Sequence, residues 1–323
     1  MFKTKLRKFI AGSLLLASGL TSALVQADAS VAITQIVEHP SLDAIRQGVK
    51  DELAERGYVV GENLKWNYES AQGSPATAAQ VAKKFAGDAP DVIVAITTPS
   101  AQTAVSAARG IPVVFSAVTD PVGAKLVKAL DKPTRWVTGT TDMLPMDKHM
   151  ALVKRVVPGA EKVGVIFNPG EANSVSSVEM VHKTAPKHGM SVVEAAATKS
   201  SDVLASARSL VGKVDVIYLP IDNTVISALE AVLKVAEQSN IPVITGDTDS
   251  VNRGAVAAVG FDYYQVGRQT GVIVERILKG ESPKNIPVEG VQTMDLVINP
   301  AAAERMGVSL SQELVAEAKK VIQ

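Results

Sequence analysis

The first half of the chain recurs in the second half, and this internal duplication restricts the fold more than any other feature of the sequence. Short apolar runs and helix-ending glycines reappear in the same order, at offsets of about 130 residues. The paired landmarks are residues 31–34 and 163–166, Gly57 and Gly189, residues 91–93 and 215–217, and residues 111–114 and 241–244. Because aliphatic runs rarely keep such a register by chance, we interpret the halves as two copies of one structural unit.

Each copy has the pattern of alternating strands and helices. Leu42, Ile45, Val49 and Leu53 have helical spacing. Residues 92–96 are continuously apolar, which is typical of a strand buried on both faces of a parallel sheet. This alternation predicts an α/β fold with helices on both sides of each parallel sheet. We therefore predict two Rossmann-like lobes joined by a hinge, with a ligand in the cleft at the carboxyl ends of the strands.

The chain is expected to cross between the lobes more than once. A first crossing is predicted near residues 138–140, and a return to the first lobe is predicted from Val259 onward. The predicted N-terminal lobe is residues 28–140 plus about 261–285, and the predicted C-terminal lobe is residues 141–260 plus about 286–323.

Residues 1–27 have the features of a secretory signal peptide. An apolar run, residues 9–24, is followed by small residues around Ala27 and preceded by the basic residues Lys3, Lys5, Arg7 and Lys8. The run is shorter than the roughly 20 apolar residues of a transmembrane helix, so we predict cleavage. Because the chain has no cysteine to carry a lipid anchor, we predict a periplasmic protein retained by the outer barrier of that compartment.

Composition excludes several classes of function. The absence of cysteine excludes disulfides, thiolate catalysis and cysteine-ligated zinc. Lys+Arg and Asp+Glu are equal at 33 each, but no acidic residue precedes Asp28, so the mature part is acidic. An acidic chain argues against nucleic acid or an anionic membrane as partner. Hydrophobic residues at 46% and charged residues at 20% are typical of an ordinary soluble globular protein.

Five short motifs, spread in order over nearly the whole mature chain, carry a resemblance to a known family. The motifs are residues 39–43 (HPSLD), 97–100 (TTPS), 119–123 (TDPVG), 137–140 (VTGT) and 221–224 (IDNT). Together they resemble the ABC-transporter substrate-binding proteins associated with tryptophan and tyrosine uptake, which have the type I periplasmic-binding-protein fold. The resemblance implies hinge closure around a small solute and delivery to an ABC permease in the inner membrane. It also implies an L-amino acid as ligand, with an aromatic one favoured.

One candidate part of the site follows the apolar strand at residues 92–96. Thr97, Thr98 and Ser100 surround Pro99, which suits the opening of a helix. The N-terminus of such a helix has free backbone N–H groups and a partial positive charge, which suit a carboxylate. The alternative is ordinary N-capping by Thr98 or Ser100, and the two roles are compatible.

The equivalent loop of the second half contains an acid. In register, Asp222 replaces Thr98 and Thr224 replaces Ser100, with Asn223 between them. An amino-acid ligand has one charge of each sign, so we expect Asp222 to accept hydrogen bonds from its ammonium group. The alternative is an Asp or Asn helix cap.

Further candidates lie in the corresponding loops of both halves. Asp247 follows residues 241–245, and Thr119 and Asp120 follow residues 111–118. Both acids also suit structural turns, and a turn is the better interpretation of Asp120, which precedes a proline. The candidates in the loops after the first strand of each half are His39, Ser41, Asn173 and Ser174.

The motifs of common α/β enzymes are missing from the sequence. It contains no nucleophile elbow, no phosphate-loop lysine motif and no dinucleotide-binding fingerprint. The four histidines have no metal-ligand spacing. We therefore predict no catalytic residue, no cofactor and no metal site.

These observations predict an extracytoplasmic solute-binding component of an ABC importer, acting as a monomer. Two alternatives remain: a periplasmic sensing module for a receptor kinase, and a hydrolase on the same scaffold. A permease or a sensor kinase encoded beside this protein, or turnover of the ligand, would distinguish among them.

Overall fold

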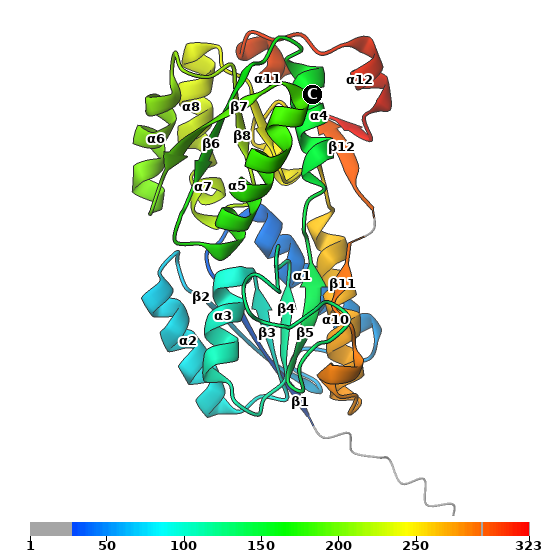
Figure 1. Ribbon diagram of the computed structural model, residues 1–323. Helices are drawn as coiled ribbons and strands as arrows, with labels where there is room; N and C mark the ends of the chain where they lie inside the picture. Colours follow the sequence, from blue (N-terminus) through cyan, green and yellow to red (C-terminus); the bar gives the residue numbers. More distant parts are fainter. Residues whose placement is uncertain (1–27, 292, 323) are drawn as a thin grey trace, which may run out of the picture.

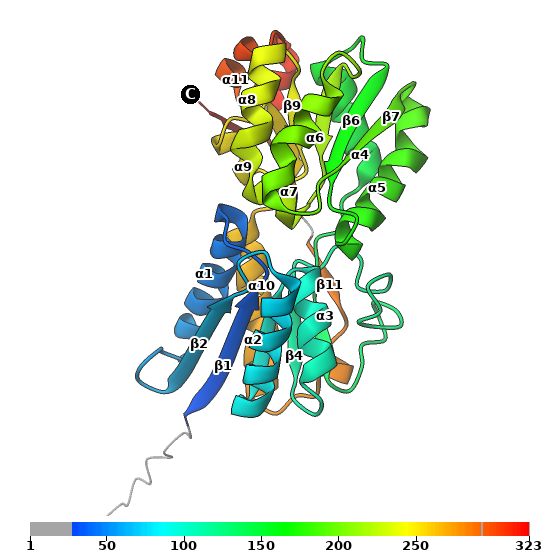
Figure 2. The same ribbon diagram turned by 90° about the vertical axis from the view of Figure 1, so that its left-hand side faces the viewer.

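The computed structural model describes residues 28–291 and 293–322, which form two lobes, one above the other in Figures 1 and 2. The predicted signal peptide, residues 1–27, lies outside the described residues. In the part of the chain that is described, no helix is both long enough and apolar enough to cross a membrane. Each lobe has one central sheet with helices packed against it, so the predicted α/β class is confirmed.

The first lobe has a six-stranded parallel sheet in the order β11-β5-β4-β3-β1-β2. Helices α2 and α3 pack together, and α1 and α10 pack together on the other side of the sheet (Figure 2). The strands are β1 (Ala29–Gln35), β2 (Leu64–Ser70), β3 (Val92–Ile96), β4 (Val113–Ser116), β5 (Val137–Thr141) and β11 (Glu289–Gly290). The helices are α1 (Pro40–Glu55), α2 (Pro75–Asp88), α3 (Thr98–Ala107) and α10 (Tyr263–Leu278).

The second lobe has a seven-stranded sheet in the order β13-β12-β10-β9-β8-β6-β7, which is parallel except where β12 meets β10. The strands are β6 (Lys162–Phe167), β7 (Ser191–Ala196), β8 (Val216–Leu219), β9 (Val243–Thr245), β10 (Ala257–Gly260), β12 (Asp295–Ile298) and β13 (Lys320–Val321). The helices are α4 (Met146–Val156), α5 (Ala172–Thr184), α6 (Val203–Leu210), α7 (Asn223–Ser227), α8 (Leu229–Ser239), α9 (Asp249–Asn252), α11 (Pro300–Arg305) and α12 (Gln312–Glu317).

The two sheets repeat one strand order, which is the structural form of the sequence duplication. The order β2-β1-β3-β4-β5 in the first sheet corresponds to β7-β6-β8-β9-β10 in the second. The apolar landmarks at residues 31–34 and 163–166 lie in the equivalent strands β1 and β6. Equivalent loops therefore follow equivalent strands in the two lobes.

Local sequence signals explain individual elements. Ser74 accepts a hydrogen bond from the backbone N–H of Thr77 at 3.2 Å, and Pro75 opens α2. β3 is buried along its whole length between β1 and β4, as its apolar run predicts. On α1, the apolar positions Leu42 and Ile45 are buried.

The chain crosses between the lobes after β5, after β10 and after β11 (Figure 1). β5 lies wholly in the first sheet, so the first crossing follows Thr141, just beyond the predicted residues 138–140. Glu289 pairs with Thr140, so the segment that returns to the first lobe extends past the predicted boundary near 285. This two-residue strand has no apolar pattern that sequence reasoning could detect.

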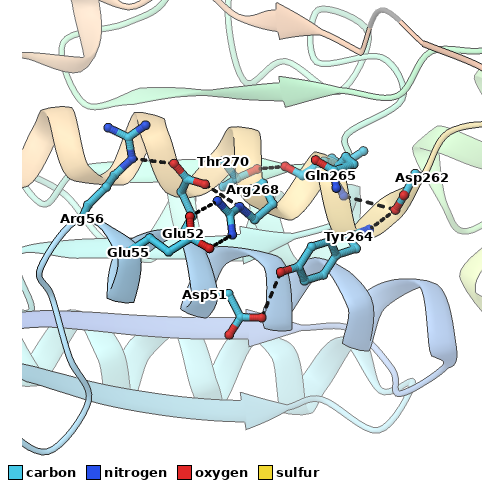
Figure 3. A network of polar contacts seen from close by, with 10 residues as sticks. Asp51, Glu52, Glu55, Arg56, Asp262, Tyr264, Gln265, Arg268 and Thr270 are labelled. Atoms are coloured by element: carbon cyan, nitrogen blue, oxygen red, sulfur yellow. Dashed lines mark hydrogen bonds and ion pairs between the residues drawn. The ribbon is translucent and has the colours of Figure 1, made fainter.

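Helices α1 and α10 pack closely and in parallel (Figure 3). Glycines lie at the contact, where a Cβ at Gly267 would meet the carbonyl oxygen of Ile45 at 2.1 Å. A Cβ at Gly48 would meet the carbonyl oxygen of Tyr264 at 2.2 Å. Only a residue without a side chain permits the two backbones to approach this closely.

Polar contacts line one edge of the same helix pair (Figure 3). Glu52 is buried and pairs with Arg268, which also binds Glu55 at 2.6 Å. The hydroxyl of Tyr264 donates to Asp51 at 3.1 Å. These contacts fix the rotation of α10 relative to α1, while exposed ion pairs such as Arg268–Glu55 add little to stability.

Gly267→Ala is expected to lower the free energy of unfolding by about 1–3 kcal/mol, because the added Cβ overlaps the backbone of Ile45. Gly87→Ala in α2 is the matched control, since a Cβ there would meet no atom within 4 Å. The control should be unchanged or up to about 1 kcal/mol more stable. Urea unfolding measures both, and equal stabilities of the two variants would contradict the close packing of α1 and α10.

Candidate ligand-binding site

The carboxyl ends of strands from both sheets face the cleft between the lobes, where an inner and an outer cavity lie. The inner cavity has a volume of about 20 Å³ and is lined by loops after β1, β3, β4, β5, β8 and β9 and by the start of α10. The outer cavity, of about 1060 Å³, lies between α2 and α3 of the first lobe and loops after β6, β7 and β8 of the second. Asn223 lines both cavities, so they adjoin.

The structure brings many of the predicted site residues to these cavities. The inner cavity is lined by His39, Ser41, Thr97, Asp222, Asn223 and Asp247, and the outer cavity by Asn223 and Thr224. Thr98 and Ser100 are buried in the first turn of α3. Thr119, Asn173 and Ser174 are buried and hydrogen-bond to lining residues.

Asp120 shapes a turn, as its position before a proline suggests. Its Oδ1 accepts a hydrogen bond from the backbone N–H of Gly123 at 2.8 Å. Its Oδ2 accepts one from Ser176 on α5 at 3.4 Å. Because α5 belongs to the opposite lobe, Asp120 is also a contact between the lobes.

The N-terminus of α3 holds buried hydroxyl groups without partners. The hydroxyls of Thr97, Thr98 and Ser100 have no hydrogen-bond partner among the described residues, and no side chain caps this helix. Thr97 has a φ of 73°, which is strained for a β-branched residue. Strain and unpaired polar groups are both costly, and both concentrate at functional sites. The capping alternative for Thr98 and Ser100 is therefore not what the structure has.

Asp222 caps a helix, which is the alternative that sequence reasoning left open. Its Oδ1 accepts from the backbone N–H of Val225 at 2.8 Å, at the start of α7. Its Oδ2 accepts from the backbone N–H of Asn168 and from Ser174, both at 2.6 Å. Protein donors therefore already surround this carboxylate.

Glu171 is a buried acid that sequence reasoning missed. Its Oε1 accepts from the Thr224 hydroxyl at 2.7 Å, and its Oε2 from the Asn223 side chain at 2.5 Å. Burial, and then the nearby Glu171 charge, raise the pKa of Asp222 to about 7. In the offset of the duplication Glu171 is the counterpart of His39, and this register could have identified it.

Asp142 and Tyr263 are further residues of the inner cavity that the sequence did not reveal. Asp142 follows β5 at the first crossing, and Tyr263 begins α10 after the second. The carboxylate of Asp142 accepts from the Thr119 hydroxyl at 3.1 Å and from the Tyr263 hydroxyl at 3.0 Å. Burial raises the pKa of Asp142 to about 6. Their one signal in the sequence is that each lies next to a predicted crossing.

Asp247 joins the two lobes inside the cleft. It accepts from the backbone N–H of Ser250 at 2.9 Å and from the Ser250 hydroxyl at 2.7 Å. It also accepts from Ser41 of the first lobe at 3.3 Å. Burial raises the pKa of Asp247.

His39 is uncharged in the cleft. Burial and then the charge of Arg253 lower its pKa to about 3, and its buried Nδ1 has no hydrogen-bond partner. The acids of the inner cavity therefore have no cationic histidine beside them. Among residues 28–291 and 293–322, no group of three or more potential ligands is arranged to hold a metal ion.

The raised pKa of Asp142 predicts a pH-dependent contribution to stability. The folded pKa of about 6 lies above the ordinary value of 3.8, so this carboxyl stabilises the fold below pH 3.8 and loses that contribution as the pH rises through about 6. Asp142→Asn removes this titration, so the stability of the variant relative to wild type should rise by about 2 kcal/mol between pH 4 and pH 7. Urea unfolding across this range measures the difference. Asp222 and Asp247 titrate in both proteins and cancel, and a difference independent of pH would contradict the prediction.

Comparison with known proteins gives a consistent assignment. A family model described as ABC transporter substrate binding protein matches residues 30–322. A protein of Clostridioides difficile (strain R20291) named tyrosine-binding protein is 43% identical over 270 residues, which are 84% of this chain and 78% of that protein.

Two solved structures differ in how well they superpose. The crystal structure of an ABC domain from Streptococcus pneumoniae in complex with L-Trp is 34% identical with a TM-score of 0.89, covering 92% of this chain and 100% of that one. The ligand-free, open structure of a substrate binding protein with adhesive properties from Clostridium difficile is 39% identical, but its TM-score is 0.68, covering 91% and 99%. This chain therefore superposes more closely on the L-Trp complex than on the ligand-free, open structure.

The family assignment rests on nearly the whole described chain and on relatives that are 43% and 34% identical to it. It confirms the type I periplasmic-binding-protein fold and a role in binding a solute without transforming it. The chain belongs to the family of ABC transporter substrate-binding proteins.

Proposed function

We propose that this protein binds an aromatic L-amino acid in the cleft between its lobes and delivers it to an ABC permease. The observation that carries the proposal is the set of buried, unpartnered hydroxyls at the N-terminus of α3, which faces the acids of the second lobe across the inner cavity. A relative named tyrosine-binding protein and a related complex with L-Trp support the ligand class.

The ligand carboxylate binds at the N-terminus of α3. This helix offers backbone N–H groups and the hydroxyls of Thr97, Thr98 and Ser100, which are buried and lack partners. A buried hydroxyl without a partner costs free energy. A bound carboxylate recovers that cost, because it accepts hydrogen bonds and bears the charge that a helix N-terminus favours.

The aromatic side chain of the ligand extends into the outer cavity. That cavity, of about 1060 Å³, has the size of typical small-molecule sites and adjoins the inner cavity at Asn223. Its walls combine apolar residues such as Ile36, Pro75 and Ala78 with polar ones such as Gln102. An amino acid placed in this way contacts both lobes, so binding and lobe closure are coupled.

The protein acts in the periplasm as a monomer, with the permease of the inner membrane as its partner. The support is the family assignment, together with the signal-like composition of residues 1–27. The residues proposed to contact the ligand are those of the inner cavity other than Asp222, and those of the first turn of α3. Asn173, Ser174 and Asp222 shape the second lobe around the ligand.

Thr97→Val tests the carboxylate site, because it removes the hydroxyl and keeps the shape of the side chain. Titration calorimetry with L-tyrosine and L-tryptophan should show binding to wild type and a loss of roughly 10- to 100-fold in the variant, since a hydrogen bond to a charged group is lost. Stability of the unliganded protein should not fall, because this hydroxyl has no partner to lose.

Thr34→Val is the matched control for this test. Thr34 also has a buried hydroxyl without a partner, but it lines neither cavity. The control should bind as tightly as wild type. If wild type binds no aromatic amino acid, the proposed function is wrong; if Thr97→Val binds like Thr34→Val, the carboxylate site is wrongly placed.

Ligand binding should close the lobes in solution. The closed arrangement has contacts across the cleft, Ser41 to Asp247 and Ser176 to Asp120, that an open form loses. Small-angle scattering should therefore give a smaller radius of gyration with saturating L-tyrosine than without ligand. A non-binding sugar is the control, and identical scattering curves with and without bound ligand would exclude closure.

A further inference from the structure

The inner cavity is small, acidic and partly unsatisfied. Its volume of about 20 Å³ is close to that of a single water molecule, and an ammonium group has a similar size. Asp142, Asp222 and Asp247 line it, whereas no lysine or arginine does so among the described residues. His39, which also lines it, is uncharged.

The positions of two of these acids are explained by the fold itself. Asp222 caps α7, and Asp247 accepts from the backbone N–H of Ser250 in the short helix α9. Each of them also accepts a serine hydroxyl at 2.6–2.7 Å. Both carboxylates therefore have structural roles that account for their burial.

Asp142 has no such role. It lies between β5 and α4, and α4 begins at Met146 without a side-chain cap. Its donors from other residues are the neutral hydroxyls of Thr119 and Tyr263, one on each oxygen. Its own backbone N–H also hydrogen-bonds to it, and a carboxylate offers about four acceptor positions. Burying an ionised carboxylate without a cation is costly, so a cation bound beside Asp142 would remove a cost that the fold does not explain.

Two unpartnered polar atoms in the same cavity indicate the chemical class of that cation. Thr97 Oγ1 and His39 Nδ1 line the same cavity, are buried and have no partner. A protonated amine has three N–H donors, which suit the Asp142 carboxylate, the free ring nitrogen and a hydroxyl oxygen. The ammonium and carboxylate of an α-amino acid leave the same carbon atom, so their sites must adjoin. Thr97 meets this requirement, since it lines the cavity and is the N-cap residue of α3.

We propose that Asp142 binds the α-ammonium group of the ligand in the inner cavity, and that it thereby restricts the protein to solutes with a free α-amino group. This inference rests on the proposed function. It replaces Asp222 as the acid that recognises the ammonium, because helix α7 already uses that side chain. The position of Asp142 at a crossing between the lobes makes ammonium recognition part of closure.

The test compares amino acids with analogues that lack the amino group. Calorimetry is run on wild type and on Asp142→Asn with L-tyrosine, L-tryptophan and the deamino analogue of each. Wild type should prefer the amino acids by on the order of 100-fold. In Asp142→Asn this preference should fall below about 10-fold, through lost affinity for the amino acids and with unchanged affinity for the analogues.

Asp215→Asn is the control, since this carboxylate holds backbone N–H groups of residues 161 and 162 at the opposite end of the second sheet. It should keep the wild-type preference. Tyr263→Phe is the second variant, for the case in which Asp142→Asn does not fold. It keeps the carboxylate and removes one hydroxyl that orients it, so the preference should fall several-fold.

The outcomes separate this inference from the proposed function. If wild type binds no aromatic amino acid, the proposed function fails and the inference with it. If wild type binds but Asp142→Asn keeps the full preference for amino acids, the inference alone is overturned. The inference is also overturned if wild type binds amino acids and their deamino analogues equally well, and if its affinity for them changes between sodium, potassium and choline buffers. That outcome would mean that an inorganic cation occupies the inner cavity.

Discussion

The close approach of α1 and α10 is the contact on which the arrangement of the cleft depends. The helices lie parallel, and Gly48 and Gly267 permit their backbones to touch. Parallel packing places both N-termini at the same end of the first lobe, where the chain meets the cleft. His39 and Ser41 at the start of α1, and Tyr263 at the start of α10, consequently line one cavity although they are far apart in sequence.

This contact also explains how a segment from late in the chain becomes part of the first lobe. After β10 the chain leaves the second sheet, and α10 packs on α1 and on strands β3, β4 and β5 of the first sheet. The buried Glu52, paired with Arg268, fixes the rotation of α10 and therefore the direction of the Tyr263 hydroxyl toward Asp142. A contact between two helices of the first lobe thus helps to orient a polar group inside the cleft.

Much of the fold could be predicted because it repeats and because its signals are local. The duplication anticipated two sheets with one strand order, and Ser74–Pro75 marked the start of α2. The two-residue β11 could not be predicted, since it has no periodicity and forms through pairing with β5.

The candidate site could likewise be predicted only in part. Loops after strands were identifiable, but Asp222 could not be assigned as a helix cap or a ligand contact, because both roles use the same residue types. Asp142 and Tyr263 escaped prediction because the crossings that bring them together follow from the packing of α10 and not from any local motif.

The cleft combines groups that need a negative partner with a group that needs a positive one. The hydroxyls at the N-terminus of α3 are buried without acceptors, and Asp142 is buried without a cation. Either arrangement alone is destabilising, and stability could be gained by replacing these groups with apolar ones. The presence of both kinds of group in one cleft is explained if a single ligand carries an anion for the hydroxyls and a cation for Asp142 on neighbouring atoms. A zwitterionic α-amino acid does so. A sugar can donate hydroxyls to a buried carboxylate but brings no positive charge to it, and a simple amine leaves α3 without an anion. The two unsatisfied groups therefore restrict the ligand more tightly together than the shape of the outer cavity does alone.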